Sequence, residues 1–247
     1  MGILNVTPDS FADGGRHNEF EAAVARGIEM IAEGVDIIDV GGESTRPGAE
    51  RVSEEEEIAR TIPVIRELAK HGATISIDTM RASTAEAAIK AGAAIINDVS
   101  GGLADDAMLQ TAARLKVPYI AMHWRGQSKD MNSKAIYGDV VNDVIAELNE
   151  RIEAALDAGI QKDKLIIDPG IGFAKDAEHN WAIIDSIDRF VAMGYPVLVG
   201  GSRKRFLGGE SPDEREQATI QLTKRLGTTG VWAVRVHSVK PHKEVLG

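Results

Sequence analysis

Eight short apolar runs, each followed by a longer segment of helical period, constrain the fold of this chain more than any other feature. The runs are rich in Val and Ile and comprise Ile3–Val6, Val35–Val40, Thr74–Ile77, Ala94–Ile96, Val117–Met122, Leu165–Ile167, Val197–Val199 and Val231–Val236. Apolarity that is continuous rather than alternating indicates strands buried on both faces, as in a parallel sheet covered by helices. Eight such units in 247 residues predict an α/β fold, the closed (β/α)8 or TIM barrel, with residues 1–247 as one domain.

Start and stop signals mark several of the expected helices. Helix starts are expected at Asn18 with Glu21, at Ser53 with Glu56 and at Ser211-Pro212 with Glu214. One helix should bury a stripe made of Val140, Val144, Leu148, Ile152 and Leu156. Glycines that should end helices are Gly34, Gly92 and Gly159. Only Lys240–Gly247 follows the eighth strand, so the last helix is expected to be truncated to a turn or two.

Composition restricts the classes of partner. The chain has 28 Lys and Arg against 38 Asp and Glu, a net charge of −10, which disfavours binding to nucleic acid or to an anionic membrane. Because there is no cysteine, disulfides, thiolate catalysis and Cys-based zinc sites are excluded. The sequence has no long apolar run and no export leader, so we expect a cytoplasmic protein.

Polar residues gather where the strands end, which in such a barrel is the side of the active site. They are Asn5, Asp9, Asp39, Glu43, Asp78, Asn97, Asp98, His123, Asp168, Ser202, Lys204, Arg235 and His237. A strand-end Asp on its own is more often a cap for the following helix. A set contributed by nearly every strand is costly to bury unless it binds something, and it therefore predicts a site.

Two loops and a late basic cluster refine this site. The segments 7–18 and 41–52 are long for strand-to-helix connections and rich in Gly, which is typical of loops that close over a substrate, although surface slack is the simpler alternative. Arg203, Lys204 and Arg205 follow the seventh strand, and Arg235 and His237 lie on the eighth. With Arg46 they form a cluster that could neutralise a phosphate or pyrophosphate, and Arg205 is expected to point elsewhere.

Eight motifs in this order and spacing resemble those of dihydropteroate synthases over essentially the whole chain. The motifs are Met1–Phe11, Gly41–Gly48, Ile77–Thr79, Ile96–Asp98, Met122-His123, Ile167–Phe173, Ser202–Lys204 and Arg235–His237. The resemblance implies a transferase of folate biosynthesis, a sulfonamide target, which joins 6-hydroxymethyl-7,8-dihydropterin pyrophosphate to p-aminobenzoate. The products would be 7,8-dihydropteroate and pyrophosphate.

The resemblance also implies roles for individual residues. Asp78, Asn97, Asp168 and Lys204 would bind the pterin ring, Arg235 would lie against its face, and Met122 and Phe173 would line the pocket. Asn5, Arg46, Arg235 and His237 would hold the pyrophosphate, with Asn5 helping to position one Mg2+. Phe11, Thr45, Pro47, Ser202 and Lys204 would form the p-aminobenzoate pocket, and Asp9 and Asp13 would stabilise developing positive charge. The residues expected to carry the chemistry are Asp9, Asp13, Lys204, Arg235 and His237.

The implied mechanism is an SN1-like substitution at the pterin methylene group, without a covalent enzyme intermediate, in a homodimer. The chain departs from the family pattern at Ala12, Gly201 and Ser238, where Ser, a side chain and Asp are expected. The short last helix also bears on the dimer, because the family associates through late helices.

Three alternatives share the predicted barrel. A cobalamin-linked pterin methyltransferase domain would not need the 41–48 loop or the Ser202–Lys204 motif, and both are present. A non-catalytic pterin-binding paralogue would be expected to lose the p-aminobenzoate loops or the lysine. A sugar-phosphate isomerase would leave Asp78, Asn97 and Asp168 unexplained.

Overall fold

Each of the eight apolar runs forms a strand, and the strands are parallel neighbours in sequence order. The computed structural model describes residues 1–7, 15–43, 51–126 and 131–247. The strands are β1 (Gly2–Asn5), β2 (Ile38–Gly41), β3 (Ile75–Asp78), β4 (Ile95–Asp98), β5 (Tyr119–Met122), β6 (Leu165–Asp168), β7 (Leu198–Val199) and β8 (Ala233–Val234). Continuous pairing joins β1 through β6, and β7 pairs with β8.

Two parallel bridges close this arrangement into a ring. Ile167 pairs with Val197 between β6 and β7, and Gly2 pairs with Val236 beyond β8. At the second bridge the Ile3 amide donates to the Val236 carbonyl at 2.8 Å, and the Val236 amide donates to the Met1 carbonyl at 2.9 Å. The predicted TIM barrel is therefore confirmed.

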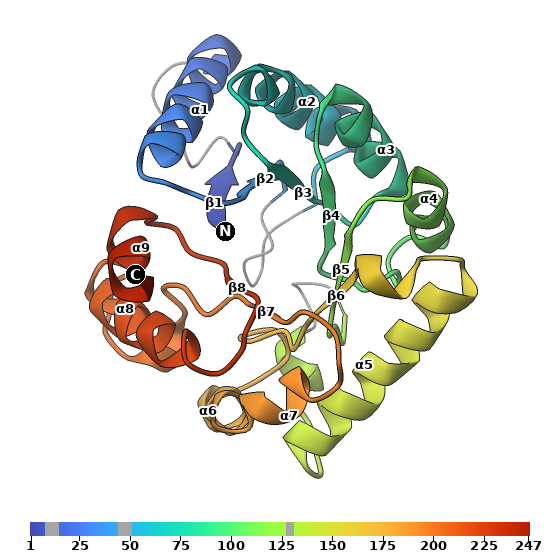
Figure 1. Ribbon diagram of the computed structural model, residues 1–247, viewed down its shortest axis with the longest axis vertical. Coiled ribbons are helices and arrows are strands. Elements are labelled where there is room, and N and C mark those ends of the chain that lie inside the picture. The colour runs from blue at the N-terminus through green and yellow to red at the C-terminus, as the bar shows by residue number, and fades with distance from the viewer. Residues whose placement is uncertain (8–14, 44–50, 127–130) are drawn as a thin grey trace.

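The helices surround the strands on the outside of the ring (Figure 1). They are α1 (Gly15–Ala32), α2 (Glu54–Lys70), α3 (Ala82–Ala91), α4 (Met108–Leu115), α5 (Val140–Asp157), α6 (Ala177–Asp185), α7 (Ile187–Val191), α8 (Glu214–Leu226) and α9 (Lys240–Leu246). Short 3-10 helices occupy Met131–Lys134, Lys162–Lys164 and Arg205–Leu207. The last helix has seven residues, as its short sequence predicted. No helix in these described ranges is long and apolar enough to cross a membrane.

Local signals set most helix ends. The Ser53 hydroxyl caps α2 by accepting from the Glu56 amide at 3.2 Å, as expected. The capping box at Asn18 is wrong, because α1 begins three residues earlier, at Gly15. Ser211 accepts from the Glu214 amide at 3.2 Å, but α8 begins at Glu214, so Pro212 precedes the helix. Four members of the predicted stripe are buried in α5, whereas Leu156 at its end is 37% exposed.

Two apolar cores hold the barrel together. The larger lies between the strands and the helices and includes Leu4, Val40, Ile77, Ile96 and Ile167. The smaller fills the barrel interior and consists of Met1, Ile37, Ile95, Ile120, Ile166 and Leu198, with Ala233 packed against it. Because successive strand residues face opposite sides, alternate residues of one strand supply the two cores. The interior core closes the amino-terminal half of the barrel and leaves the carboxyl ends for the site.

Candidate active site

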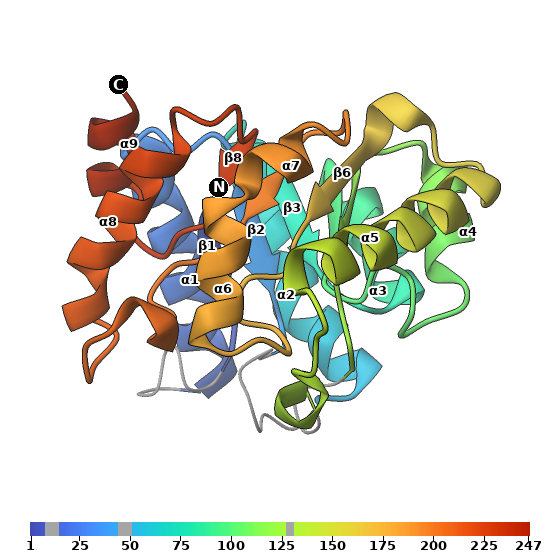
Figure 2. The same ribbon diagram turned by 90° about the horizontal axis from the view of Figure 1, so that it is seen from below.

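A polar layer lies directly above the interior core. The residues two positions beyond Ile37, Ile95, Ile120, Ile166 and Ala233 are Asp39, Asn97, Met122, Asp168 and Arg235. A step of two residues returns to the same face of a strand, so these side chains point into the barrel one level nearer to the carboxyl ends. In Figure 2 this end of the strands faces the bottom of the view.

Arg235 is the centre of one half of this layer. Its Nε donates to Asp39 Oδ2 at 2.5 Å, and its Nη2 donates to Asp78 Oδ2 at 2.6 Å. Asn97 Nδ2 donates to the same Asp39 oxygen at 3.1 Å. Because the Asn97 amino group is held by Asp39, its carbonyl oxygen is left as an acceptor for a ligand.

Charge and burial oppose each other in this network. Burial raises the pKa of Asp78 to about 7, although the Arg235 guanidinium pulls it down. Burial lowers the pKa of Arg235, but the carboxylates of Asp39 and Asp78 outweigh burial and raise the pKa above its usual value. Asp78 can therefore gain or lose a proton near neutral pH, whereas Arg235 stays charged.

Asp168 and Lys204 form the other half of the layer. Asp168 Oδ1 accepts from the Gly170 amide at 2.7 Å, and burial raises the pKa of this carboxyl. The Lys204 ammonium donates to the Ile171 carbonyl and lies 4.5 Å from the centroid of the Phe173 ring. Burial lowers the pKa of Lys204 to about 8, and the Asp168 carboxylate opposes this decrease. A carboxylate, an ammonium group and an aromatic ring thus border one space.

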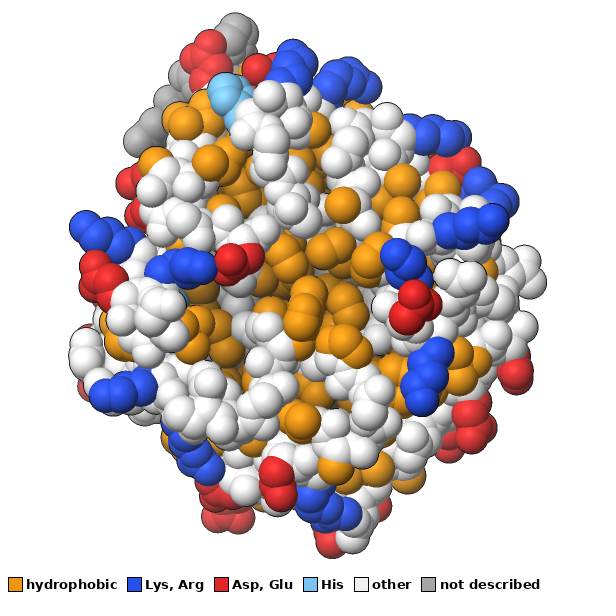
Figure 3. Space-filling view, viewed as in Figure 1, with side chains coloured by type: hydrophobic (Ala, Val, Ile, Leu, Met, Phe, Trp, Pro, Cys, Tyr) orange, Lys and Arg blue, Asp and Glu red, His pale blue; other side chains and the backbone are white. Residues whose placement is uncertain are grey.

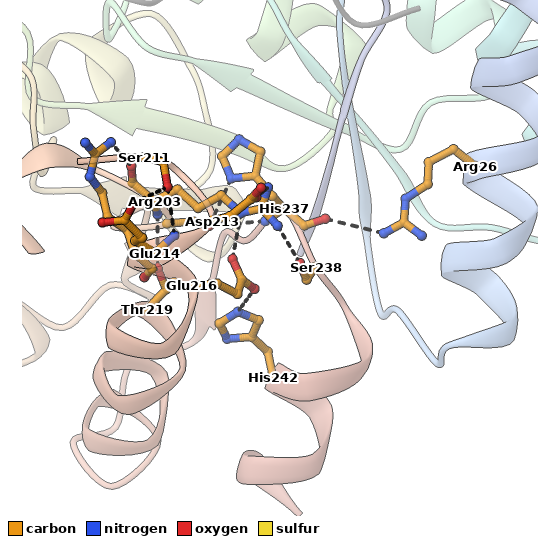
Figure 4. A network of polar contacts seen from close by, with 12 residues as sticks. Arg26, Arg203, Ser211, Asp213, Glu214, Glu216, Thr219, His237, Ser238 and His242 are labelled. Atoms are coloured by element: carbon orange, nitrogen blue, oxygen red, sulfur yellow. Dashed lines mark hydrogen bonds and ion pairs between the residues drawn. The ribbon is translucent and has the colours of Figure 1, made fainter. Parts of the chain in front are cut away.

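Ser202 and His237 lie together at the ends of β7 and β8. Ser202 Oγ is 2.9 Å from His237 Nδ1 and accepts from the His237 amide at 3.3 Å. Arg26 of α1 donates to the His237 carbonyl at 3.4 Å, so the backbone after β8 is held on both sides (Figure 4). The family resemblance places Ser202 in the p-aminobenzoate pocket and His237 at the pyrophosphate, and the two side chains are neighbours in the structure.

Some predicted site residues point away from the interior. Asp98 accepts from Tyr119 and from the Ser100 and Gly102 amides, and it is fully buried outside the barrel. His123 contacts Glu147 of α5. Each follows an inward residue by one position, so the strand pleat turns it outward. Both residues lie at the carboxyl ends of their strands as expected, but the prediction that their side chains belong to the site is wrong.

Two more charged side chains serve the surrounding structure. Glu43 forms ion pairs with Arg51 and Arg81. Arg203 points toward α8, where its Nε donates to Glu216 Oε2 at 2.6 Å, and its Nη2 donates to Ser238 Oγ (Figure 4). Arg203 is therefore not part of the predicted anion cluster.

The departures at Gly201 and Ser238 have structural counterparts. A side-chain carbon at Gly201 would lie 2.8 Å from Leu222 Cδ2, so α8 packs where a side chain is expected. Ser238 is a partner of Arg203. Asp9, Phe11, Ala12, Asp13, Thr45, Arg46 and Pro47 lie outside the described residues.

The amino-terminal face of the barrel has a different character. Hydrophobic side chains gather at its centre (Figure 3), where a hollow is lined by Met1, Ile37, Trp232, Val236 and Leu246. Its polar lining residues pair with neighbours: Lys243 contacts Asp36 at 3.1 Å, and His242 contacts Glu216 at 3.3 Å. The polar groups that could orient a ligand are at the opposite end, and we place the site there.

Comparison with known proteins identifies the barrel. Residues 1–237 match the family model described as pterin binding enzyme. The chain belongs to the pterin binding enzyme family. It is 47% identical over its whole length to dihydropteroate synthase of Mycobacterium leprae, of which it covers 90%. It is also 47% identical to the Bacillus subtilis enzyme, with 97% of this chain and 83% of that protein covered.

Solved structures agree with this assignment. A Xanthomonas albilineans dihydropteroate synthase with 4-aminobenzoic acid has a TM-score of 0.94 and 43% identity, covering all of this chain and 89% of that one. The same enzyme in complex with 7,8-dihydropteroate has a TM-score of 0.90 and 40% identity, covering all of this chain and 90% of that one. The pterin binding chain described here is thus a transferase of the dihydropteroate synthase type.

One interior residue received no role from the sequence. Asp39 belongs to the strand-end acids, yet it is also the shared acceptor of Arg235 and Asn97, and it is fully buried. Its position two residues after Ile37, in an interior-facing register, is the signal that could have identified it.

Proposed function

We propose that this site carries out the dihydropteroate synthase reaction, with the dihydropterin held in the polar layer and p-aminobenzoate bound nearer to the mouth. The observation that carries the proposal is the set of acceptors Asp78, Asn97 and Asp168 at the carboxyl ends of the strands, with the Lys204 ammonium near enough to Asp168 and Asp78 for their charges to interact. A pterin edge has adjacent N–H donors and ring acceptors, and such a set complements it.

Each side chain then has a chemical task. The Asp78 and Asp168 carboxylates and the Asn97 carbonyl accept hydrogen bonds from the pterin, and Lys204 donates to it. Arg235, held edge-on by Asp39 and Asp78, offers its flat face to the ring. Phe173 and Met122 supply apolar walls. Met122 is 3% exposed, and core packing explains its position as well as contact with the pterin does.

The mouth suits an anion and one magnesium ion. His237, anchored by Ser202, and Arg235 are the described residues that would hold the pyrophosphate, and Arg46 would add a third. Among the described residues, no group of three or more His, Asp or Glu could hold a metal ion. Magnesium needs few protein ligands when phosphate and water supply the rest.

Asn5 fits such an ion. Its amide oxygen lies beside Gly41, at the carboxyl ends of the first strands, because a side-chain carbon at Gly41 would lie 3.7 Å from Asn5 Oδ1 and 3.5 Å from Asp78 Cβ. Asn5 would hold the ion there, and bound magnesium would neutralise charge on the leaving pyrophosphate.

The proposed substitution breaks the bond between the pterin methylene carbon and the pyrophosphate oxygen, and the electron pair leaves with the pyrophosphate. His237 and Arg235 stabilise the negative charge that develops on the leaving group. The pterin ring, fixed by its hydrogen bonds, delocalises the positive charge, and Asp9 and Asp13 would add to that stabilisation. The aryl amine of p-aminobenzoate, with its carboxylate near Ser202 and beside Phe11, Thr45, Pro47 and Lys204, then bonds to the carbon and loses a proton.

Pyrophosphate release that depends on p-aminobenzoate tests the reaction. We expect release with the dihydropterin pyrophosphate, p-aminobenzoate and Mg2+, and almost none from Lys204→Ala or Asp168→Asn. Near-normal turnover in both variants would contradict the assigned roles. Binding without release would instead indicate a non-catalytic pterin-binding protein, and methyl transfer to a cobalamin would indicate the methyltransferase.

The assembly and location of the enzyme belong to the same proposal. By the family resemblance, residues 1–247 act as one pterin-binding domain, in a homodimer, in the cytoplasm. Measuring the mass in solution by light scattering tests the dimer, and a mass of one chain at micromolar concentration would contradict it.

A further inference from the structure

A buried lysine lies behind the loop between β6 and α6. Lys175 is 8% exposed, and its Nζ donates to the carbonyls of Gly170 and Phe173, both at 3.1 Å, and approaches His123 Nδ1 at 2.9 Å. Burial lowers the pKa of Lys175 to about 7, although the Asp168 carboxylate opposes the decrease. A buried amino group that contacts three acceptors on one loop and one strand end fixes their relative position.

His123 links this lysine to helix α5. Burial and the nearby Lys175 lower the pKa of His123 to about 4, so its imidazole is neutral at pH 7. Since Nδ1 accepts from Lys175, Nε2 carries the proton and donates to Glu147 Oε2 at 2.9 Å. Arg125 also donates to Glu147, at 3.0 Å. Lys175 is therefore held by His123 at the end of β5, and His123 in turn is held by Glu147 of α5.

The loop held by Lys175 is packed between β5 and Lys204. A side-chain carbon on Gly170 would come within 2.4 Å of the His123 carbonyl, and one on Gly172 within 2.6 Å of Lys204 Cδ. The Tyr137 hydroxyl donates to the Ala174 carbonyl at 3.0 Å. Both glycines have positive φ, so the loop combines close contacts with a backbone that suits glycine.

Lys204 depends on this loop for its position. Its ammonium donates to the Ile171 carbonyl and lies over the Phe173 ring. Phe173 is itself held by Lys175 through its carbonyl, and Ile171 lies between Phe173 and the other held residue, Gly170. We propose that Lys175 is a positioning residue that fixes the 169–174 loop and thereby places the Lys204 ammonium at the pterin pocket. This inference rests on the pterin-binding role proposed for Lys204.

A double-mutant cycle tests whether the two lysines act together. Affinity for 6-hydroxymethyl-7,8-dihydropterin is measured by calorimetry for Lys175→Met, Lys204→Met and the double variant. We expect Lys175→Met to weaken binding about tenfold, the value of one hydrogen bond to a charged group. The double variant should bind no more weakly than Lys204→Met alone, because the loop then has no ammonium to place. The exposed Lys162→Met variant should bind like the wild type.

Two results would overturn the role of Lys175: wild-type affinity in Lys175→Met, or fold-losses that multiply in the double variant. Fold-losses that multiply are the pattern of an independent or purely structural effect. Should Lys175→Met fail to fold, Tyr137→Phe loosens the same loop by one hydrogen bond, and the same cycle with Lys204→Met decides. A wild-type chain that binds the dihydropterin without releasing pyrophosphate contradicts the proposed reaction, and the cycle still decides the role of Lys175.

Discussion

At the scale of single residues, Asp78 connects proton binding to ligand binding. Its pKa is raised to about 7, first by burial and against the attraction of Arg235. Only the ionised carboxylate accepts hydrogen bonds through both oxygens, and one oxygen is already used by Arg235. The affinity for the pterin should therefore depend on the ionisation of this group.

We predict that affinity for 6-hydroxymethyl-7,8-dihydropterin, a ligand without phosphate groups, falls below pH 7 by about tenfold per pH unit. Calorimetry from pH 5 to pH 8 measures the profile. The Asp78→Asn variant should bind weakly and should no longer show the loss of affinity of about tenfold per pH unit below pH 7. A flat profile in the wild type would refute the assignment of this titration to Asp78.

The contribution of Asp78 to stability has the opposite sign. Its folded-state pKa is above the ordinary value of 3.8, so the folded chain binds the proton first. This contribution is fully present below about pH 4 and is lost as the pH rises through about 7. For Asp78 alone, pterin binding should therefore be strongest in the pH range where the contribution of this group to stability has been lost.

The direction of single side chains also limits what could be predicted from sequence. Asn97 and Asp98 are adjacent, yet one faces the barrel interior and the other accepts from Tyr119 in the outer core. Strand periodicity separates such neighbours only when the inward register is known, and eight continuous apolar runs do not reveal it. The interior core, recognised from Ile95 and Ile120, supplies that register.

At the scale of elements, the strands were predicted within a few residues, because burial on both faces leaves a strong apolar signal. Helix starts were less predictable. Ser53 caps α2 as expected, whereas α1 begins at Gly15 rather than after Asn18. A capping signal shows where a helix can start, but it does not prevent the helix from starting a turn earlier.

Two glycines, one of them in the loop between β6 and α6, share a left-handed backbone but differ in their surroundings. Gly172 and Gly194 have φ values of 78° and 80°, but only Gly172 is crowded, since a side-chain carbon there would lie 2.6 Å from Lys204 Cδ. Nothing lies within 4 Å of the corresponding position at Gly194. The two glycines therefore separate the backbone cost of a substitution from its effect on Lys204.

We expect Gly172→Ala and Gly194→Ala to lower the free energy of unfolding by about 1–2 kcal/mol each, the cost of a left-handed backbone for alanine. Only Gly172→Ala should also weaken pterin binding, by at least about tenfold, because the methyl group displaces the lysine. Urea denaturation and calorimetry measure the two effects. Equal affinities of both variants for the dihydropterin would contradict a loop that positions Lys204.

At the scale of the whole molecule, the site depends on closure of the barrel. Arg235 lies just beyond β8, yet its partners Asp39 and Asp78 come from β2 and β3. The bridge between Gly2 and Val236 brings these distant parts of the chain together. The sequence predicted a barrel from the number of units, but it could not show which side chains meet across the closing edge.

We predict that the closing edge unfolds only with the rest of the barrel. The Ile3 and Val236 amides, which donate across this edge at 2.8 and 2.9 Å, should exchange with a free energy within about 1 kcal/mol of those of Ile96 and Ile167. Ile96 and Ile167 donate to the Pro118 and Pro196 carbonyls in the other parts of the ring. The turn amide of Leu103, in contrast, should exchange through local opening, because it belongs to an exposed residue outside the ring. Native-state hydrogen exchange measures all five. If Ile3 and Val236 exchanged several kcal/mol more easily than Ile96, the ring would open between β8 and β1, and Arg235 would separate from both of its carboxylates without global unfolding.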